Sequence, residues 1–231
     1  MVTETNRYAA QFLSSKRLKP HSRFGSWVPV TTGEMRVFLS LLLLQGIIQK
    51  PEQSMYWSQH NLVSTPVFGD TMTRNRFFLI MKVLHFVYNE VPVDPENHPQ
   101  PKLWKIWPFL SRHVQNFQTS YVLERDISID ESLMLYKGRL SWRWYLPLKR
   151  ARFGVKLFVL CEAESAYIWN LIVDTGKGTN IATRHERDAQ LPMGTKVVLK
   201  LMEPLEGRKQ TFMEQPEQQE RTCPHLSRRQ N

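Results

Sequence analysis

Hydrophobic residues recur with a helical period over the first half of the chain. Between residue 5 and about residue 116 they return every three or four positions, which is the spacing of one helix face. The pattern predicts helices over 5–13, 33–50, 73–86 and 102–118, and four prolines mark a loop over 88–101. Thr32 is expected to cap the second helix, because its hydroxyl can accept from free backbone amides of the first turn. The first half is therefore predicted to be a helical domain, 1–119.

The period changes after Arg125. Residues 127–136 alternate between apolar and polar, which predicts a strand. The apolar runs 155–161 and 167–173 are joined by a short polar link and predict a β-hairpin, and 195–205 has the spacing of a following helix. Strand, hairpin and helix in this order predict the opening half of a mixed α/β sheet over 120–205, so the predicted fold class is α+β.

The last residues, 206–231, differ from the rest in composition. Few of them are apolar, no period is present, and Gln, Glu and Arg predominate. Such a segment cannot bury enough apolar surface to offset the entropy lost on ordering. A disordered C-terminal tail is therefore predicted.

The chain carries an excess of positive charge. It has 31 Lys and Arg against 21 Asp and Glu, which gives a formal net charge of +10. This balance favours a polyanionic partner, either nucleic acid or an acidic membrane surface, although a basic surface without a dedicated partner gives the same total. Two cysteines cannot build a disulfide framework, so a reducing compartment is expected. The most apolar stretch, 37–48, is shorter than the roughly 18 residues that a membrane span needs.

Two adjacent carboxylates, Asp130 and Glu131, lie in the predicted strand 127–136. A strand inside a sheet holds a carboxylate at a fixed position, which suits a ligand of Mg²⁺ or Mn²⁺. Phosphoryl transfer through two metals needs several acidic ligands from different elements. An exposed strand end explains the pair equally well on spacing alone.

The segment that follows is basic and aromatic. No acid lies between Glu131 and Glu162. The cations there are Lys137, Arg139, Arg143, Lys149, Arg150, Arg152 and Lys156, interleaved with Trp142, Trp144, Tyr145 and Phe153. Cations that contact phosphates beside rings that stack on bases are typical of a nucleic-acid groove. The alternative is that the rings belong to the core and the cations to a solvated face.

Six segments of the chain carry a family resemblance. They are TNRYA (5–9), MYWS (55–58), RNRFFLIMKVLHF (74–86), KLWKI (102–106), the long segment 128–161 and DTGKGT (174–179). Together they resemble the piggyBac family of transposases and their domesticated, transposable element-derived relatives. The resemblance spans most of residues 5–205, and it implies that the helical domain 1–119 is a dimerisation- or DNA-binding-like domain.

The resemblance implies a ribonuclease H-like fold in which Asp130 is the first of three catalytic aspartates and binds Mg²⁺ or Mn²⁺. Glu131 has no catalytic part in the family. The implied reaction is nicking at a transposon end, followed by attack of the freed 3′ hydroxyl on DNA. The residues implied to line the DNA channel are Lys137, Arg139, Tyr145, Lys149 and Lys156. Double-stranded DNA is the expected partner and the nucleus the expected location, with no membrane partner and no small-molecule substrate.

The resemblance to the family ends near Glu206, and the second and third catalytic aspartates of the family are not recognised in this sequence. The ribonuclease H-like sheet is therefore expected to be incomplete, with an open edge beside the strand that bears Asp130. A single carboxylate is not expected to retain a metal ion. Other acids considered as ligands are Asp174, Glu186, Asp188 and Glu203.

These expectations lead to one hypothesis and two alternatives. The hypothesis is a DNA-binding protein with a truncated transposase catalytic domain that does not catalyse strand transfer, acting alone, as a homodimer or with a full-length relative. The first alternative is a metal-dependent transposase or nuclease whose other ligands are unrecognised. The second is a nonfunctional fragment.

Overall fold

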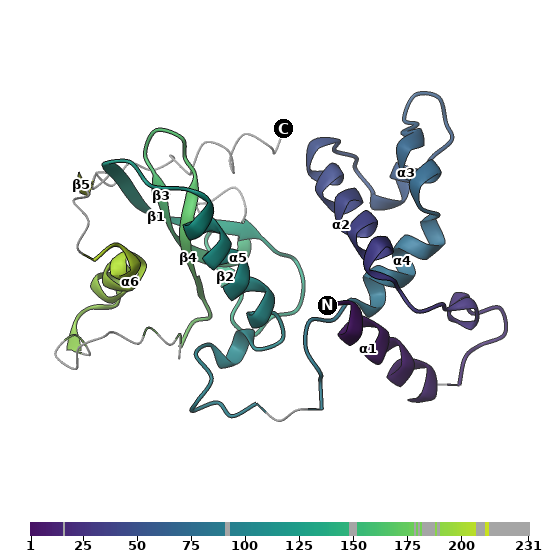
Figure 1. The fold of residues 1–231 in the computed structure, drawn as a ribbon, viewed down its shortest axis with the longest axis horizontal. Helices are drawn as coiled ribbons and strands as arrows, with labels where there is room; N and C mark the ends of the chain where they lie inside the picture. Colours follow the sequence, from purple (N-terminus) through teal and green to yellow (C-terminus); the bar gives the residue numbers. More distant parts are fainter. Residues whose placement is uncertain are drawn as a thin grey trace. The chain divides into compact units, whose positions relative to one another are not determined.

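A computed structural model describes residues 1–15, 17–90, 93–147, 152–177, 179, 181, 188, 190–206 and 211–212. The chain divides into two compact units, Met1–Pro92 and Val93–Asn231 (Figure 1). No helix in the described ranges is long and apolar enough to cross a membrane. The tail predicted to be disordered, 206–231, lies outside the described residues except for Glu206, Thr211 and Phe212.

The first unit is helical, as the hydrophobic spacing predicted. Its helices are α1 (Val2–Ser15), α2 (Thr32–Ile47), α3 (Pro66–Thr71) and α4 (Arg74–Val83), with 3₁₀ turns at Arg23–Ser26 and Gln53–Trp57. The prediction that Thr32 caps α2 is wrong, because the capping residue is Thr31. Its backbone is extended and its hydroxyl accepts from the amide of Glu34, so Thr32 already belongs to the helix.

Two of the resemblance motifs stabilise this unit by satisfying backbone groups. The amide group of Asn6 donates to the carbonyl oxygen of Val30 at 2.9 Å and accepts from its amide at 2.7 Å. The buried hydroxyl of Thr5 bonds both backbone groups of His85. Tyr56 of the MYWS segment donates to the carbonyl oxygen of Ile48 at 2.6 Å. These side chains therefore have structural roles in the helical unit.

The second unit is built on a mixed sheet. Its elements are α5 (Trp107–Ser120), β1 (Asp126–Leu135), β2 (Trp144–Tyr145), β3 (Phe153–Glu162), β4 (Ile168–Asp174), α6 (Met193–Met202) and β5 (Thr211–Phe212). Strand β3 pairs antiparallel with β1 on one side and with β4 and β2 on the other. The predicted strand, hairpin and helix are thus all present. The fold class predicted from the sequence is confirmed.

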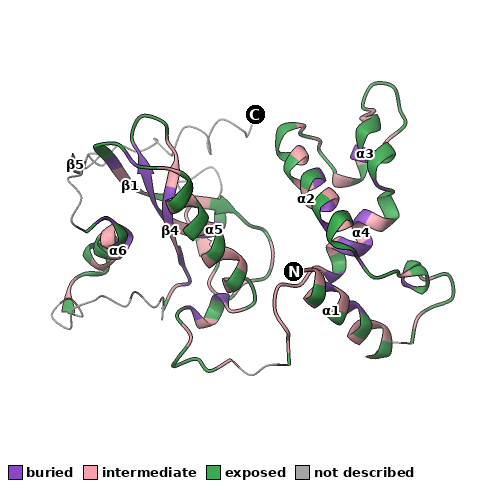
Figure 2. Ribbon diagram, viewed as in Figure 1, coloured by how far each residue is buried: buried purple, intermediate pink, exposed green. Residues whose placement is uncertain are grey.

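Helices cover both faces of this sheet (Figure 1). On one face Val197 and Leu201 of α6 pack against Ile127, Phe158 and Leu160 of the strands. On the other face Trp107 and Leu110 of α5 pack against Val155 and Val173. Figure 2 shows the buried residues along β1 and β4 and on the side of α6 that faces them.

Helix α5 belongs to the sheet unit because its apolar side packs on β4 and β3. The boundary between the compact units therefore lies at Pro92 and Val93, before α5, whereas the sequence placed a domain boundary after residue 119. Hydrophobic spacing identifies a helix but not the surface it covers. Only the packing assigns α5 to one unit.

The outer edge of β1 is covered at one end. Thr211 and Phe212 of β5 run parallel to β1 and pair with Asp126 and Ile127. In the part of the chain that the structure describes, no strand pairs with residues 128–135 on this side. The backbone groups of that edge are available to a further strand.

Candidate nucleic-acid interface and the Asp130 face

The adjacent carboxylates of Asp130 and Glu131, called the DE pair below, point to opposite faces of the sheet. In β1, Asp130 lies opposite Val159 of β3, and Glu131 lies opposite Phe158. Because side chains alternate along a strand, Asp130 shares its face with Val155 and α5, whereas Glu131 shares its face with α6. The two acids are adjacent in sequence, but their side chains lie on opposite faces of the sheet.

Glu131 has a cationic partner. Its carboxylate pairs with the ammonium of Lys156 at 2.7 Å. The same ammonium lies 4.7 Å from the ring centre of Phe158 and 5.1 Å from that of Trp144. Lys156, predicted to contact DNA, is thus placed on the face opposite Asp130 and is engaged by a carboxylate and two rings.

Asp130 is partly exposed, and one of its carboxylate oxygens accepts from the backbone amide of Glu131 at 2.7 Å. Among the described residues, no three His, Cys, Asp or Glu side chains come together in a group that could hold a metal ion. Glu203 pairs with Lys200 at 2.6 Å, and Asp188 also has an interaction partner. Glu186 lies outside the described residues.

The carboxylate of Asp174 accepts hydrogen bonds within the loop that the DTGKGT segment forms. Asp174 lies opposite Lys156 in the sheet, and therefore on the face away from Asp130. Its carboxylate accepts from the amide of Gly176 at 2.8 Å and from the hydroxyl of Thr179 at 3.1 Å. Gly176 has a φ of 73°, a conformation that glycine adopts without strain.

Lys102 of the KLWKI segment secures the same loop. Its ammonium donates to the carbonyl oxygens of Thr175, at 2.8 Å, and of Lys177. Two segments that the resemblance identified separately are thus in direct contact. The sequence contains no signal that pairs them, because the contact is between a side chain and the backbone.

The loop between β1 and β2 carries part of the basic segment and exposes its cations to solvent. Lys137, Arg139 and Arg143 are all exposed there. The guanidinium of Arg143 donates to the carbonyl oxygens of Lys137 at 3.4 Å and Gly138 at 3.2 Å, which fixes the path of the loop. Residues 136–143 are called the basic loop below.

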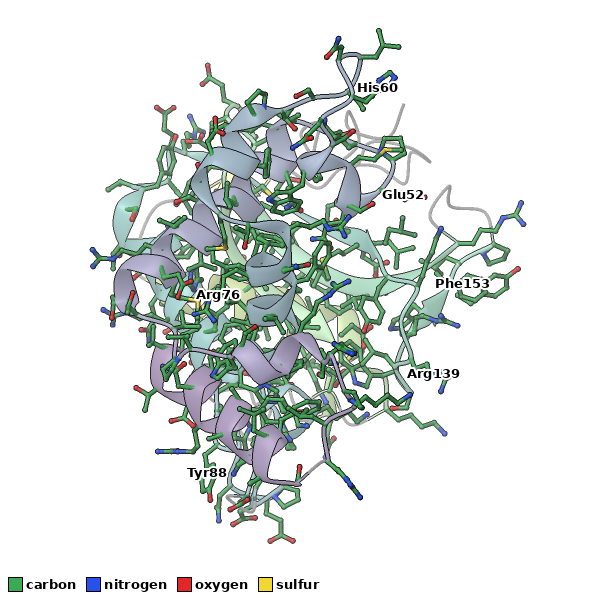
Figure 3. The ribbon with its side chains drawn as sticks, turned by 90° about the vertical axis from the view of Figure 1, so that its right-hand side faces the viewer. Glu52, His60, Arg76, Tyr88, Arg139 and Phe153 are labelled. Carbon is green, nitrogen blue, oxygen red and sulfur yellow. The ribbon has the colours of Figure 1, made fainter. Side chains whose placement is uncertain are left out.

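Two aromatic rings lie beside the basic loop. Tyr145 of β2 pairs with Phe153 of β3, and their ring centres are 4.7 Å apart. The guanidinium of Arg143 lies 4.6 Å from the centre of the Phe153 ring. Figure 3 shows Arg139 and Phe153 extending outward from the same side of the ribbon.

The site residues predicted from the sequence thus fall into three groups. Lys137 and Arg139 are exposed in the basic loop and Tyr145 is exposed on β2, which follows that loop. Lys156 lies on the face away from Asp130, and Lys149 lies outside the described residues. Arg143 and Phe153 belong to the basic, aromatic segment whose composition is typical of a nucleic-acid groove. The register of β2 and β3 brings them to Tyr145, and that register was not predicted.

Comparison with known proteins places this chain in a family. The family model described as Transposase IS4 matches residues 1–217. The human piggyBac transposable element-derived protein 2 is 29% identical over 213 residues, which cover 90% of this chain and 31% of that protein. The chain belongs to the piggyBac transposase family. The human piggyBac transposable element-derived protein 3 is 27% identical over 181 residues, covering 78% of this chain and 29% of that protein.

A solved structure shares the fold of this piggyBac family member. It is a piggyBac transposase, determined by cryo-EM in a synaptic complex with hairpin DNA. It superposes with a TM-score of 0.72 at 20% identity and covers 91% of this chain and 42% of that chain. The chain thus spans less than half of that transposase and about three tenths of the human relatives.

Proposed function

We propose that this chain is a DNA-binding member of the piggyBac family that does not carry out strand transfer by itself. The basic loop is the observation that carries the proposal. It exposes Lys137 and Arg139 within a segment, 132–161, that contains no acid. Exposed cations without neighbouring acids supply phosphate contacts, which account for most of the affinity of proteins for DNA.

Among the residues that the structure describes, no acids join Asp130 in the ligand set that Mg²⁺ or Mn²⁺ requires for two-metal chemistry. Such a site needs several carboxylate oxygens around the ions. Asp174 lies on the other face of the sheet and is engaged by Gly176 and Thr179, and Glu203 is paired with Lys200. This separation of the acids supports a role without metal-dependent catalysis.

The expected partner is double-stranded DNA, and the expected location is the nucleus. A homodimer or a complex with a full-length relative is part of the same proposal. The outer edge of β1 over 128–135 supports it, because unpaired strand edges favour association with another chain. Gel filtration with light scattering, with and without duplex DNA, tests the oligomeric state.

Duplex binding is tested by fluorescence anisotropy over a series of salt concentrations. Lys137→Gln combined with Arg139→Gln is expected to weaken binding and to lower the slope of log affinity against log salt by about 2, because two phosphate contacts are lost. The charge-matched control combines Arg17→Gln with Lys19→Gln, two exposed cations of the helical unit. An equal loss in both double variants contradicts a specific role for the basic loop.

The enzyme alternative is tested with nicked-plasmid assays in Mg²⁺ and Mn²⁺. No metal-dependent nicking above background is expected from the purified chain. Nicking that disappears in Asp130→Asn would instead establish a metal-dependent nuclease and overturn the proposed lack of catalysis. Absence of any duplex binding by a folded chain would contradict the DNA-binding proposal.

A further inference from the structure

The Tyr145 and Phe153 rings form an exposed aromatic pair. Tyr145 is 53% exposed and Phe153 is 40% exposed, although their ring centres are only 4.7 Å apart, with planes inclined by 32°. The core pair Phe38 and Phe77 packs at a similar 5.0 Å, but both of its rings are fully buried. The exposed pair therefore leaves aromatic surface in solvent that a core pair would bury.

Neighbouring contacts hold this pair in place. Tyr145 and Phe153 are opposite residues of two antiparallel strands, so their side chains lie on the same face of the sheet. The guanidinium of Arg143 lies against Phe153 while donating to two carbonyl groups of the basic loop. Two rings and one planar cation thus form a preorganised surface next to the basic loop, in which the side chains of Lys137 and Arg139 are exposed.

The chemistry of this surface favours one form of DNA. In a duplex the faces of the bases are stacked on one another, so an aromatic side chain on the protein surface cannot stack on them. Unpaired bases have free faces, and each stacked base contributes roughly 1–3 kcal/mol in single-strand binding proteins. Cations beside the rings serve the phosphates of the same strand.

We propose that Tyr145 and Phe153 form a stacking site for unpaired bases, and that this chain binds DNA with a single-stranded overhang more tightly than blunt duplex. The inference rests on the proposed DNA-binding function and adds the form of DNA that is recognised. Lys137 and Arg139 contact phosphates in both forms of DNA. The two rings contribute where bases are unpaired.

The test compares three labelled probes with the full chain by fluorescence anisotropy. The probes are a blunt duplex, the same duplex with a short single-stranded overhang, and that overhang with abasic sites in place of its bases. The wild-type chain is expected to favour the overhang probe over the abasic probe. Tyr145→Leu and Phe153→Leu keep apolar volume but remove the ring, and each is expected to lower the ratio of overhang to duplex affinity by roughly tenfold, the loss of about one stacked base.

Substitutions that keep the ring provide the control. Phe153→Tyr is expected to retain the overhang preference, and circular dichroism with thermal unfolding confirms that each variant is folded. Equal affinity of the wild-type chain for the overhang and abasic probes contradicts base stacking while leaving duplex binding intact. Absence of binding to all three probes contradicts the proposed DNA-binding function itself.

One further outcome would assign the surface to a different partner. Aromatic and basic side chains also bind membrane interfaces. The stacking proposal is overturned in favour of a lipid surface if three results are obtained together. The chain binds vesicles of anionic lipid, Phe153→Leu loses that binding, and the overhang preference is absent.

Discussion

Glu131 pairs with Lys156 at 2.7 Å on the face of the sheet that α6 covers, while its neighbour Asp130 lies on the face that α5 covers. The acid that the family resemblance marks as catalytic is therefore separated from the acid beside it. The carboxylate of Glu131 is engaged by the ammonium of Lys156 and lies on the other face of the sheet from Asp130. The Asp130 face is left with a single carboxylate from the DE pair.

The ion pair between Glu131 and Lys156 is expected to contribute little to stability. The side chain of Lys156 is 15% exposed but that of Glu131 is 54% exposed, so solvent screens the attraction. A double-mutant cycle with Glu131→Gln and Lys156→Met, measured by urea unfolding, is expected to give a coupling below about 1 kcal/mol. Lys156→Ala should destabilise more than Lys156→Met, because it also removes the aliphatic stem. A coupling above about 2 kcal/mol would show that screening is overestimated.

Glu34 is expected to make the helical unit sensitive to acid. Its carboxylate forms two bonds of 2.6 Å with the guanidinium of Arg76, whose hydrogen bonds hold the pKa of Glu34 below its usual value. Because the pKa is lower in the folded state, this stabilisation is fully present above the unfolded-state pKa of about 4.5 and is lost as pH falls through the folded-state pKa. Hydrogen exchange in α2 and α4 at pH 3–7 should therefore show weaker protection at the acidic end.

Glu34→Gln provides the comparison for that experiment. The variant is expected to be less protected than the wild-type chain at pH 7, and the difference should shrink as the pH falls through the folded-state pKa of Glu34 and the wild-type carboxylate takes up a proton. Parallel curves for the two proteins across this range would contradict the assigned role of Glu34.

Gly154 is required by the close approach of β1 and β3. A Cβ atom at this position would lie 2.4 Å from the backbone carbonyl oxygen of Met134, which cannot move aside as a flexible side chain could. Gly154→Ala is therefore expected to destabilise the chain by about 1–3 kcal/mol in urea unfolding. The control is Gly194→Ala in α6, where nothing lies within 4 Å and where alanine should stabilise by about 0.5–1 kcal/mol. Equal effects of the two substitutions would contradict the predicted clash.

Glu162 links the hairpin of β3 and β4 to the segment that precedes β1 through hydrogen bonds. Its buried carboxylate accepts from the hydroxyls of Ser165 and Tyr121 and from the amide of Glu124. These donors, Ser165 foremost, hold the pKa of Glu162 below its usual value. In Glu162→Gln an amide NH₂ group, which can only donate, replaces a carboxylate oxygen that accepts hydrogen bonds. The substitution is therefore expected to lower the free energy of unfolding by about 2 kcal/mol. Glu164→Gln, at an exposed position in the same turn, should change it by less than about 0.5 kcal/mol.

The sequence predicted the elements of the sheet unit well but not how they meet. The strand 127–136, the hairpin and the helix near 195–205 were identified from periodicity, and the structure has them as β1, β3 with β4, and α6. The short strand β5 was not predicted, because two residues carry no periodic signal. The pairing of Tyr145 with Phe153 was missed for a similar reason, since it depends on the register between β2 and β3.

The sequence by itself determined the helical first half, the strands that follow, the family, and the acid-free basic segment. These properties follow from periodicity, composition and local motifs, all of which depend on residues that are close together in the sequence. Only the tertiary structure decided that α5 packs on the sheet, that Asp130 and Glu131 face opposite ways, and that Arg143, Tyr145 and Phe153 form one surface. The physical reason is that strand register and packing join residues distant in sequence, and no local pattern encodes which distant partner each residue meets.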